Sequence, residues 1–169
     1  MSDRIALQGE QGCFSHLASL EIFPNAEIKF CSTFEETFQL AKGNPKYKII
    51  IPIENSLAGR VADIHYLIPK YKLQVHAEHF HKINHNLLGI KGSKIKEIET
   101  VRSHSQAIGQ CQKIISNNNL KPIISADTAG SARFIFEKKD KSEAAIASAL
   151  AAKIYDLEIL KSNIEDESG

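Results

Sequence analysis

The sequence has little cysteine, and its cysteines are not arranged as a disulfide framework or zinc site requires. Cys13, Cys31 and Cys111 lie far apart and form no CxxC pair. An odd number of isolated cysteines is typical of reduced thiols in a cytoplasm. We therefore expect neither disulfide bonds nor a cysteine-based metal site.

The sequence also lacks a long apolar run. None of its hydrophobic stretches approaches the roughly 20 residues that a helix needs to cross a bilayer. The opening residues, MSDRIALQGEQG, have no basic stretch followed by an apolar one, as a signal peptide would. These absences predict a cytoplasmic protein with no membrane partner.

Neither sign of charge is in excess. The 21 Lys and Arg residues are interleaved with 20 Asp and Glu residues, giving a formal net charge of +1. Nucleic acids and anionic membranes attract basic patches, so the sequence offers no electrostatic basis for either partner. A chain of 169 residues can form one compact domain or two small lobes.

The common sequence motifs of cofactor and nucleophile sites are missing as well. There is no Walker loop, no HExxH and no Cys–His zinc pattern. Gly9 and Gly12 indicate close approach of the backbone to a neighbour, but two glycines fall short of a dinucleotide fingerprint. Ser103 and His104 are adjacent, so on a strand they point to opposite faces and cannot form a catalytic pair. We expect no cofactor and no metal ion.

The segment Leu73–Leu88 is long, has no turn signals and suits an extended crossing between two lobes. It holds four histidines, and imidazoles at short spacing can share a metal ion. Only His79, His81 and His85 fall on one face of a strand, and no carboxylate or cysteine nearby completes the set. The pattern therefore favours ordinary surface or hinge histidines, including His76, over a metal site.

Short hydrophobic strands alternate with amphipathic helices along most of the chain. This alternation is typical of a mostly parallel sheet flanked by helices. Thr33 and Glu36 have the spacing of a capping box, which predicts a helix from Phe34 to Ala41. The other expected helices start near Phe14, Leu57, Ala107, Ala132 and Ala147, and the expected strands are 4–8, 27–31, 49–53, 100–103, 122–125, 144–146 and 157–160.

One arrangement recurs at four places: a strand ends in polar side chains that open a helix. At Ile49–Arg60 the strand is followed by Glu54, Asn55 and Ser56, and a helix is predicted from Leu57. The others lie at 8–15, 103–106 and 127–131. Helix amino termini attract anions, and ligands bind beyond the carboxyl ends of parallel strands. For any single turn, simple helix capping is the favoured alternative.

Six segments, in this order, resemble the catalytic domain of prephenate dehydratase. The PIEN, SHxQA and NIxD pieces are the most specific of them. The segments are IALQGEQGCFSHLA (5–18), IPIENSLAG (51–59), HNLLGI (85–90), VRSHSQAIGQC (101–111), SADTAGSAR (125–133) and AAIASALAAKIYDLEILKSNIED (144–166).

The resemblance implies an α/β protein of two lobes, like a type II periplasmic binding protein, with the site in the cleft between them. The first lobe is expected at 1–76 and the second at 77–164, with 165–169 returning toward the first. Catalytic positions carried over from the family fall on Asn55, Ser103 and Gln110. Positions expected to bind substrate are Glu54, Ser56, Thr128 and Gln106, the last because it shares a helix face with Gln110 above Ser103.

The implied reaction is the loss of carbon dioxide and the ring hydroxyl from prephenate, giving phenylpyruvate for phenylalanine synthesis. Forming an aromatic ring is strongly downhill, so the step needs no metal or redox cofactor. It needs a proton donor for the departing hydroxyl and neutral groups that position a dianion. The family commonly dimerises, so a homodimer is expected.

The sequence departs from the family at its end. A Thr-Arg-Phe motif, whose threonine is the leading proton donor, should follow the NIxD segment but begins where this sequence stops, at Gly169. A regulatory ACT-type domain, which commonly follows, is absent too. Truncation or disorder is the favoured explanation, and full activity of this chain alone is not expected. Two alternatives remain: arogenate as the substrate, or a non-catalytic small-anion binding module of the cytoplasm.

Overall fold

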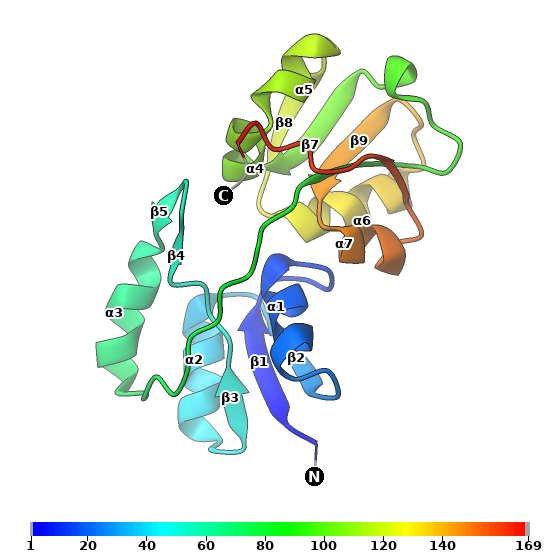
Figure 1. The fold of residues 1–169 in the computed structure, drawn as a ribbon. Helices are drawn as coiled ribbons and strands as arrows, with labels where there is room; N and C mark the ends of the chain where they lie inside the picture. The colour runs from blue at the N-terminus through cyan, green and yellow to red at the C-terminus, as the bar shows by residue number, and fades with distance from the viewer. Residues whose placement is uncertain (1, 168–169) are drawn as a thin grey trace. The chain divides into compact units, whose positions relative to one another are not determined.

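The computed structural model describes residues 2–167, and the chain forms two compact units (Figure 1). The first unit holds Met1–Glu10 and Phe14–Lys82, and the second holds Gln11–Cys13 and Ile83–Gly169. The lobe boundaries expected from the sequence, with residues 165–169 returning to the first lobe, stay a prediction. Residues 168 and 169 of that expected return lie outside the described part.

The first unit is a three-stranded parallel sheet with helices packed on it. Its central strand β1 (Arg4–Gln8) buries Ile5, Ala6 and Leu7 completely, because both of its edges are paired and both faces are covered. The strand order is β2-β1-β3, with β2 at Glu27–Cys31 and β3 at Tyr47–Ile49. Helices α1 (Phe14–Ile22), α2 (Phe34–Gly43) and α3 (Ala62–Tyr71) complete the unit. The expected alternation of strands and helices is confirmed here.

The predicted start of α2 is also confirmed. The Thr33 hydroxyl accepts the backbone N–H of Glu36 at 3.1 Å, which satisfies one of the helix's unpaired donors. The Glu36 carboxylate in turn accepts the N–H of Ser32 at 2.7 Å. Helix α2 packs against α3, and Phe38, Ile64 and Leu67 form the apolar contact between them.

The predicted strand-to-helix turn at Ile49–Arg60 is wrong in its details. Strand β3 ends at Ile49, and a β-hairpin follows, with strands β4 (Glu54–Asn55) and β5 (Gly59–Arg60). The Asn55 side-chain oxygen accepts the N–H groups of Leu57 and Ala58, both at 2.9 Å, and so closes the hairpin turn. The helix starts five residues later than predicted, and Leu57 is exposed in the turn.

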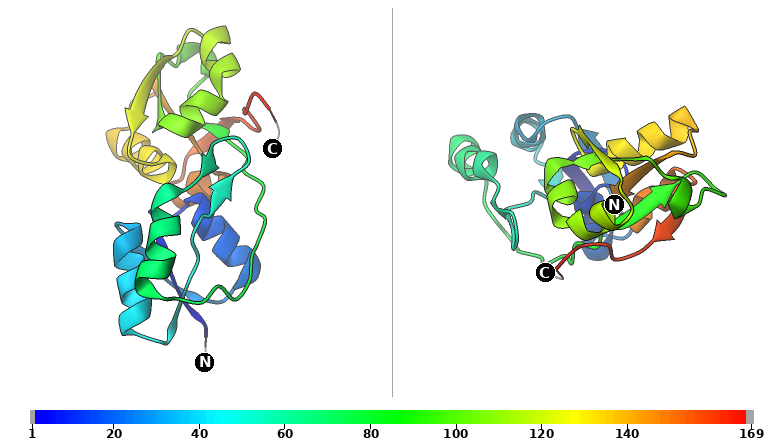
Figure 2. Two further views of the ribbon diagram at one scale, coloured as in Figure 1. Left: turned by 90° about the vertical axis from the view of Figure 1, so that its left-hand side faces the viewer. Right: turned by 90° about the horizontal axis from the view of Figure 1, so that it is seen from above.

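The second unit contains a five-stranded sheet in the order β10-β6-β9-β7-β8. Figure 2 draws the ribbon from two further sides. Only β6 runs against the others, because β7 pairs in parallel with β8 and β9 whereas β6 is antiparallel to both β9 and β10. The strands are β6 (Asn86–Gly89), β7 (Thr100–His104), β8 (Lys121–Ser125), β9 (Glu143–Ala147) and β10 (Glu158–Lys161). A short 3-10 helix, η1 (Ile95–Glu97), lies between β6 and β7, and helices α6 (Thr128–Lys138) and α7 (Ala149–Ile154) follow β8 and β9.

The single helix predicted to start near Ala107 is two short helices in the structure. Helix α4 (Ser105–Gln110) ends at Cys111, whose ψ of 34° is not helical, and α5 (Gln112–Asn117) begins directly after it. The break leaves new N–H groups at the start of α5. The Asp166 carboxylate accepts those of Gln112 and Lys113 at 2.8 and 2.9 Å, from 54 and 53 residues away in sequence.

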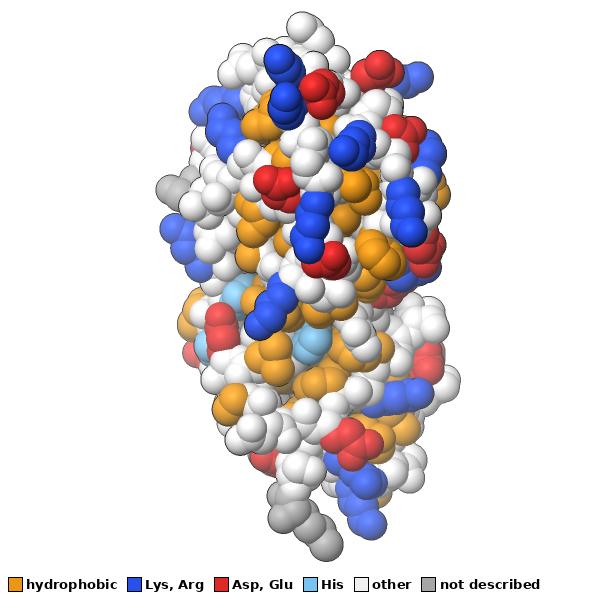
Figure 3. All heavy atoms as spheres, turned by 90° about the vertical axis from the view of Figure 1, so that its right-hand side faces the viewer, with side chains coloured by type: hydrophobic (Ala, Val, Ile, Leu, Met, Phe, Trp, Pro, Cys, Tyr) orange, Lys and Arg blue, Asp and Glu red, His pale blue; other side chains and the backbone are white. Residues whose placement is uncertain are grey.

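The segment between α3 and β6 forms no helix or strand from Leu73 to His85, and the chain passes from the first unit to the second within it. Lys and Arg side chains are interspersed with Asp and Glu side chains on the face drawn in Figure 3, as the balanced charge predicts. Within residues 2–167, every helix is too short or too polar to cross a membrane.

Candidate active site

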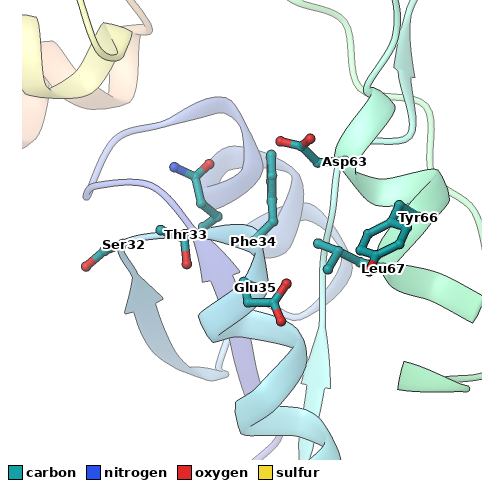
Figure 4. A pocket seen from close by; sticks show the side chains of 8 residues that line it. Ser32, Thr33, Phe34, Glu35, Asp63, Tyr66 and Leu67 are labelled. Carbon is teal, nitrogen blue, oxygen red and sulfur yellow. The ribbon is translucent and has the colours of Figure 1, made fainter. Parts of the chain in front are cut away.

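The first unit has a hollow of about 480 Å³ at the carboxyl ends of β1 and β2. Parallel strands end in such places, and α2 begins there. Tyr66 and Leu67 of α3 close one side of it, with Ser32 and Thr33 opposite (Figure 4). The remaining lining residues are Gln8, Phe34, Glu35 and Asp63.

The hollow is not suited to a dianion. Lys70 and Tyr71 both donate hydrogen bonds to the Glu35 carboxylate, which holds the pKa of Glu35 below its ordinary value. Glu35 is therefore charged at neutral pH, and Asp63 adds a second carboxyl group to the wall. None of the predicted site residues lines this hollow.

The three polar residues predicted from the PIEN piece lie in the β4–β5 hairpin of the first unit. Glu54 and Ser56 are exposed, and Asn55 is half-buried. Since the Asn55 oxygen closes the hairpin turn, its place in the fold is fixed by local hydrogen bonds rather than by a helix end.

In the second unit, Gln110 is held by a histidine. The Gln110 Oε1 lies 2.9 Å from Nε2 of His85, so the imidazole donates this hydrogen bond when Nε2 carries the proton. His85 is only 3% exposed, and burial lowers its pKa because a charged ring is disfavoured away from water. The result is a neutral histidine–glutamine pair.

Residues 164–166, near the end of the described chain, hydrogen-bond to the same two residues, His85 and Gln110. The backbone N–H of His85 donates to Glu165 Oε2 at 3.0 Å, and its carbonyl accepts the N–H of Ile164 at 2.9 Å. The Gln110 carbonyl accepts the N–H of Asp166 at 2.7 Å. The NIxD piece is therefore bound to His85, directly before β6, and to the α4–α5 break, within the second unit.

Sequence reasoning placed His85 among surface or hinge histidines, and that was wrong. It is the buried partner of Gln110. The available signal was its position at the start of the HNLLGI piece, directly before the apolar residues of β6.

Ser103 is completely buried near the end of β7. Its hydroxyl donates to the carbonyl of Ile146 on the adjacent strand β9 at 2.6 Å. This hydrogen bond ties the two strands together near their carboxyl ends. The side chain therefore supports the sheet edge from which α4 starts.

The other two predicted residues lie at helix starts. Gln106 is exposed in the first turn of α4, four residues before Gln110 and on the same helix, as expected. Thr128 is the half-buried first residue of α6, where Asp127 caps the helix by accepting the Gly130 N–H at 2.5 Å. Of the four turns singled out in the sequence, this one caps its helix in the ordinary way.

Comparison with known proteins relates the chain to prephenate and arogenate dehydratases. The sequence profile of the prephenate dehydratase family matches residues 5–169. A Komagataeibacter europaeus protein named bifunctional N-acyl-homoserine lactone acylase/prephenate dehydratase is 40% identical over 162 residues, which cover 96% of this chain and 58% of that protein. The Arabidopsis thaliana protein named arogenate dehydratase/prephenate dehydratase 1, chloroplastic, is 38% identical over 164 residues, 97% of this chain and 42% of that protein.

The fold is shared with a solved structure. The crystal structure of prephenate dehydratase from Arthrobacter aurescens, in complex with L-Phe, matches with a TM-score of 0.89 at 23% identity, covering 98% of this chain and 56% of that one. The match confirms the predicted α/β fold. The chain spans 58% and 42% of the two curated relatives. With the family profile matched from residue 5 onward and relatives near 40% identity, the chain belongs to the prephenate dehydratase family.

Proposed function

We propose that this chain forms most of the catalytic domain of a prephenate dehydratase, a carbon–oxygen lyase that converts prephenate to phenylpyruvate. The observation that carries the proposal is the family match over residues 5–169. The substrate in this proposal is a small dianion, bound in the cytoplasm by a homodimer. No cofactor takes part.

Gln110 is the residue of the second unit best suited to meet the substrate. Its oxygen lies 2.9 Å from Nε2 of His85, which fixes the orientation of the carboxamide, and a carboxamide nitrogen can donate to a carboxylate or hydroxyl oxygen. The pair is neutral, and it can position a dianion without the tight ion pair that would stabilise the ground state. Asn55 supplies a second carboxamide from the hairpin, flanked by Glu54 and Ser56.

Ser103 positions the end of strand β7 and does not itself contact the substrate. Its hydroxyl is engaged with Ile146, and it holds the end of β7 that leads into α4. Gln106 and Thr128 lie in the first turns of α4 and α6, where His104 and Asp127 accept the N–H groups of Gln106 and Gly130, so their side chains are the groups that we propose for substrate contact. They bind the substrate carboxylates in this proposal.

The reaction is one elimination. The ring C–C bond to the carboxylate breaks, its electrons form a ring double bond, and the C–O bond to the ring hydroxyl breaks as that oxygen takes a proton. Carbon dioxide and water leave, and phenylpyruvate remains. The proton donor expected from the family is the threonine of a Thr-Arg-Phe motif after the NIxD piece. The last residue of the NIxD piece, Asp166, donates its N–H to the Gln110 carbonyl.

The test uses the full-length protein, with phenylpyruvate followed by its absorbance in alkali. Asn55→Ala and Gln110→Ala are each expected to lower kcat/KM by about 10²-fold, the usual effect of losing one positioned hydrogen-bond donor. The matched controls, Asn117→Ala in α5 and Gln74→Ala in the segment after α3, remove exposed amides and are expected to change kcat/KM less than twofold. The 169-residue chain by itself is expected to bind prephenate weakly and turn it over poorly.

Parallel assays with arogenate and with an N-acyl-homoserine lactone decide the substrate, since the relatives carry names for all three activities. Saturable prephenate binding without turnover by the full-length protein supports the non-catalytic module instead. Unchanged kinetics for Asn55→Ala, Ser103→Ala and Gln110→Ala together reject the proposed site.

A further inference from the structure

Two histidines and a glutamate converge on one point of the first unit. Glu21 lies in the last turn of α1, and His79 and His81 lie on the segment that follows α3. The Glu21 Oε2 is 2.6 Å from Nε2 of His79, and Glu21 Oε1 is 3.0 Å from Nδ1 of His81. One ligand atom from each side chain lies within 4.8 Å of the other two.

These spacings suit a metal ion. An ion with bonds of about 2.0–2.1 Å in tetrahedral geometry holds its ligand atoms roughly 3.3 Å apart, within the range that the three side chains span. His79 and His81 are two residues apart on an extended segment, so both side chains point to the same side. Glu21 is 58 residues from His79 in sequence, so a local sequence motif could not predict that these three side chains lie together.

The chemistry of the set selects the ion. Imidazole nitrogens favour zinc and the other late divalent metals of the first row, whereas magnesium and calcium prefer oxygen ligands alone. Glu21 supplies the one carboxylate oxygen of the set beside the two imidazole nitrogens. The side chains are 46%, 35% and 15% exposed for Glu21, His79 and His81, which admits water to a fourth position.

We propose that Glu21, His79 and His81 form a binding site for one divalent metal ion of the zinc type. The bound ion fixes the segment around residues 79–81 to α1. This segment holds the last residues of the first unit before the chain enters the second. The ion is structural, and the dehydratase reaction does not require it.

His85 does not belong to this site, although the sequence places it on the same face as His79 and His81. It is buried in the second unit with Gln110. The missing carboxylate comes from α1, which no spacing within Leu73–Leu88 could indicate.

The test titrates the 169-residue chain, purified without a histidine tag, with Zn²⁺ in competition with a fluorescent zinc indicator. One ion per chain is expected. Glu21→Gln, His79→Ala and His81→Ala are each expected to weaken zinc binding by at least about 10- to 100-fold. That is the cost of losing a group that only supports a metal ligand, and a direct ligand should cost no less. The matched controls are Glu78→Gln and His76→Ala, exposed side chains of the same segment, which are expected to change affinity less than twofold.

Cobalt identifies the ligands independently of the variants. Co²⁺ in this site is expected to give visible d–d bands without a thiolate charge-transfer band, because the set contains no cysteine. Zn²⁺ is also expected to slow hydrogen exchange in residues 77–82. Absence of saturable binding, an equal loss of affinity in the control variants, or a thiolate band would each overturn the proposal. In those cases the three side chains only hydrogen-bond the segment to α1.

Discussion

Ser148 is the residue whose replacement tests most directly how the second unit incorporates residues 11–13. It is 1% exposed and lies between β9 and α7. Its hydroxyl oxygen accepts the N–H of Ala151 at 3.0 Å and donates to the carbonyl of Gly12 at 2.6 Å. One side chain thus caps a helix and fixes a segment 136 residues away in sequence.

Ser148→Ala removes both hydrogen bonds. Loss of the cap costs about 1 kcal/mol of unfolding free energy. The buried Gly12 carbonyl also loses a donor, and disrupting a hydrogen bond to a buried acceptor costs about 1–3 kcal/mol more. The expected decrease in the free energy of unfolding is therefore about 2–4 kcal/mol.

Urea unfolding at pH 7, followed by far-UV circular dichroism, measures the change. Asp127→Ala is the matched control, because Asp127 caps α6 of the same unit through Gly130 and is expected to cost only about 1 kcal/mol. A loss for Ser148→Ala no larger than that for Asp127→Ala would refute the reasoning, since the bond to Gly12 would then contribute nothing.

Three further predictions concern buried groups. Gly12→Ala is expected to destabilise the chain by at least about 1–3 kcal/mol, because Gly12 has φ +90° and a Cβ there would lie 2.7 Å from Cα of Ala151; thermal unfolding measures it. Burial lowers the pKa of His85, so the unfolded chain binds more protons just below pH 6.5, and stability is expected to fall as pH drops through this window; His85→Gln should flatten the profile measured by urea unfolding. Burial raises the pKa of Cys111 to about 12, so its thiol is expected to resist a disulfide reagent at pH 8 while the partly exposed Cys13 reacts first.

The order of strands and helices could be predicted because it depends on local patterns. The apolar residues of β1 and β9 are nearly continuous, which is typical of strands buried on both faces. The cap of α2 depends on Thr33 and Glu36, three residues apart, so a short window of sequence contains the whole interaction. The close approach expected at Gly12 is confirmed as well, because glycine has no Cβ and tolerates both the positive φ and the nearness of Ala151.

The sequence predictions fail in two situations. In one, a short stretch fits both a helix and a turn; in the other, the hydrogen-bond partner lies far away in sequence. Leu57 has helical spacing with Val61 and Ile64, yet the Asn55 side chain closes a turn there instead. The N–H groups that the break at Cys111 leaves unpaired within the helix donate to Asp166, more than 50 residues later. Sequence periodicity records which residues are apolar, and it contains no information about which distant carboxylate will accept a free N–H group.

The sequence by itself determined the α/β class, the order of most elements and, through its motifs, membership of the prephenate dehydratase family. The tertiary structure decided which polar groups meet: His85 with Gln110, Asp166 with the start of α5, and Glu21 with His79 and His81. These pairs are separated by 25 to 60 residues in sequence. Their contacts arise only when separate strands and helices pack, because burial removes water and leaves each polar group to find its partner within the fold.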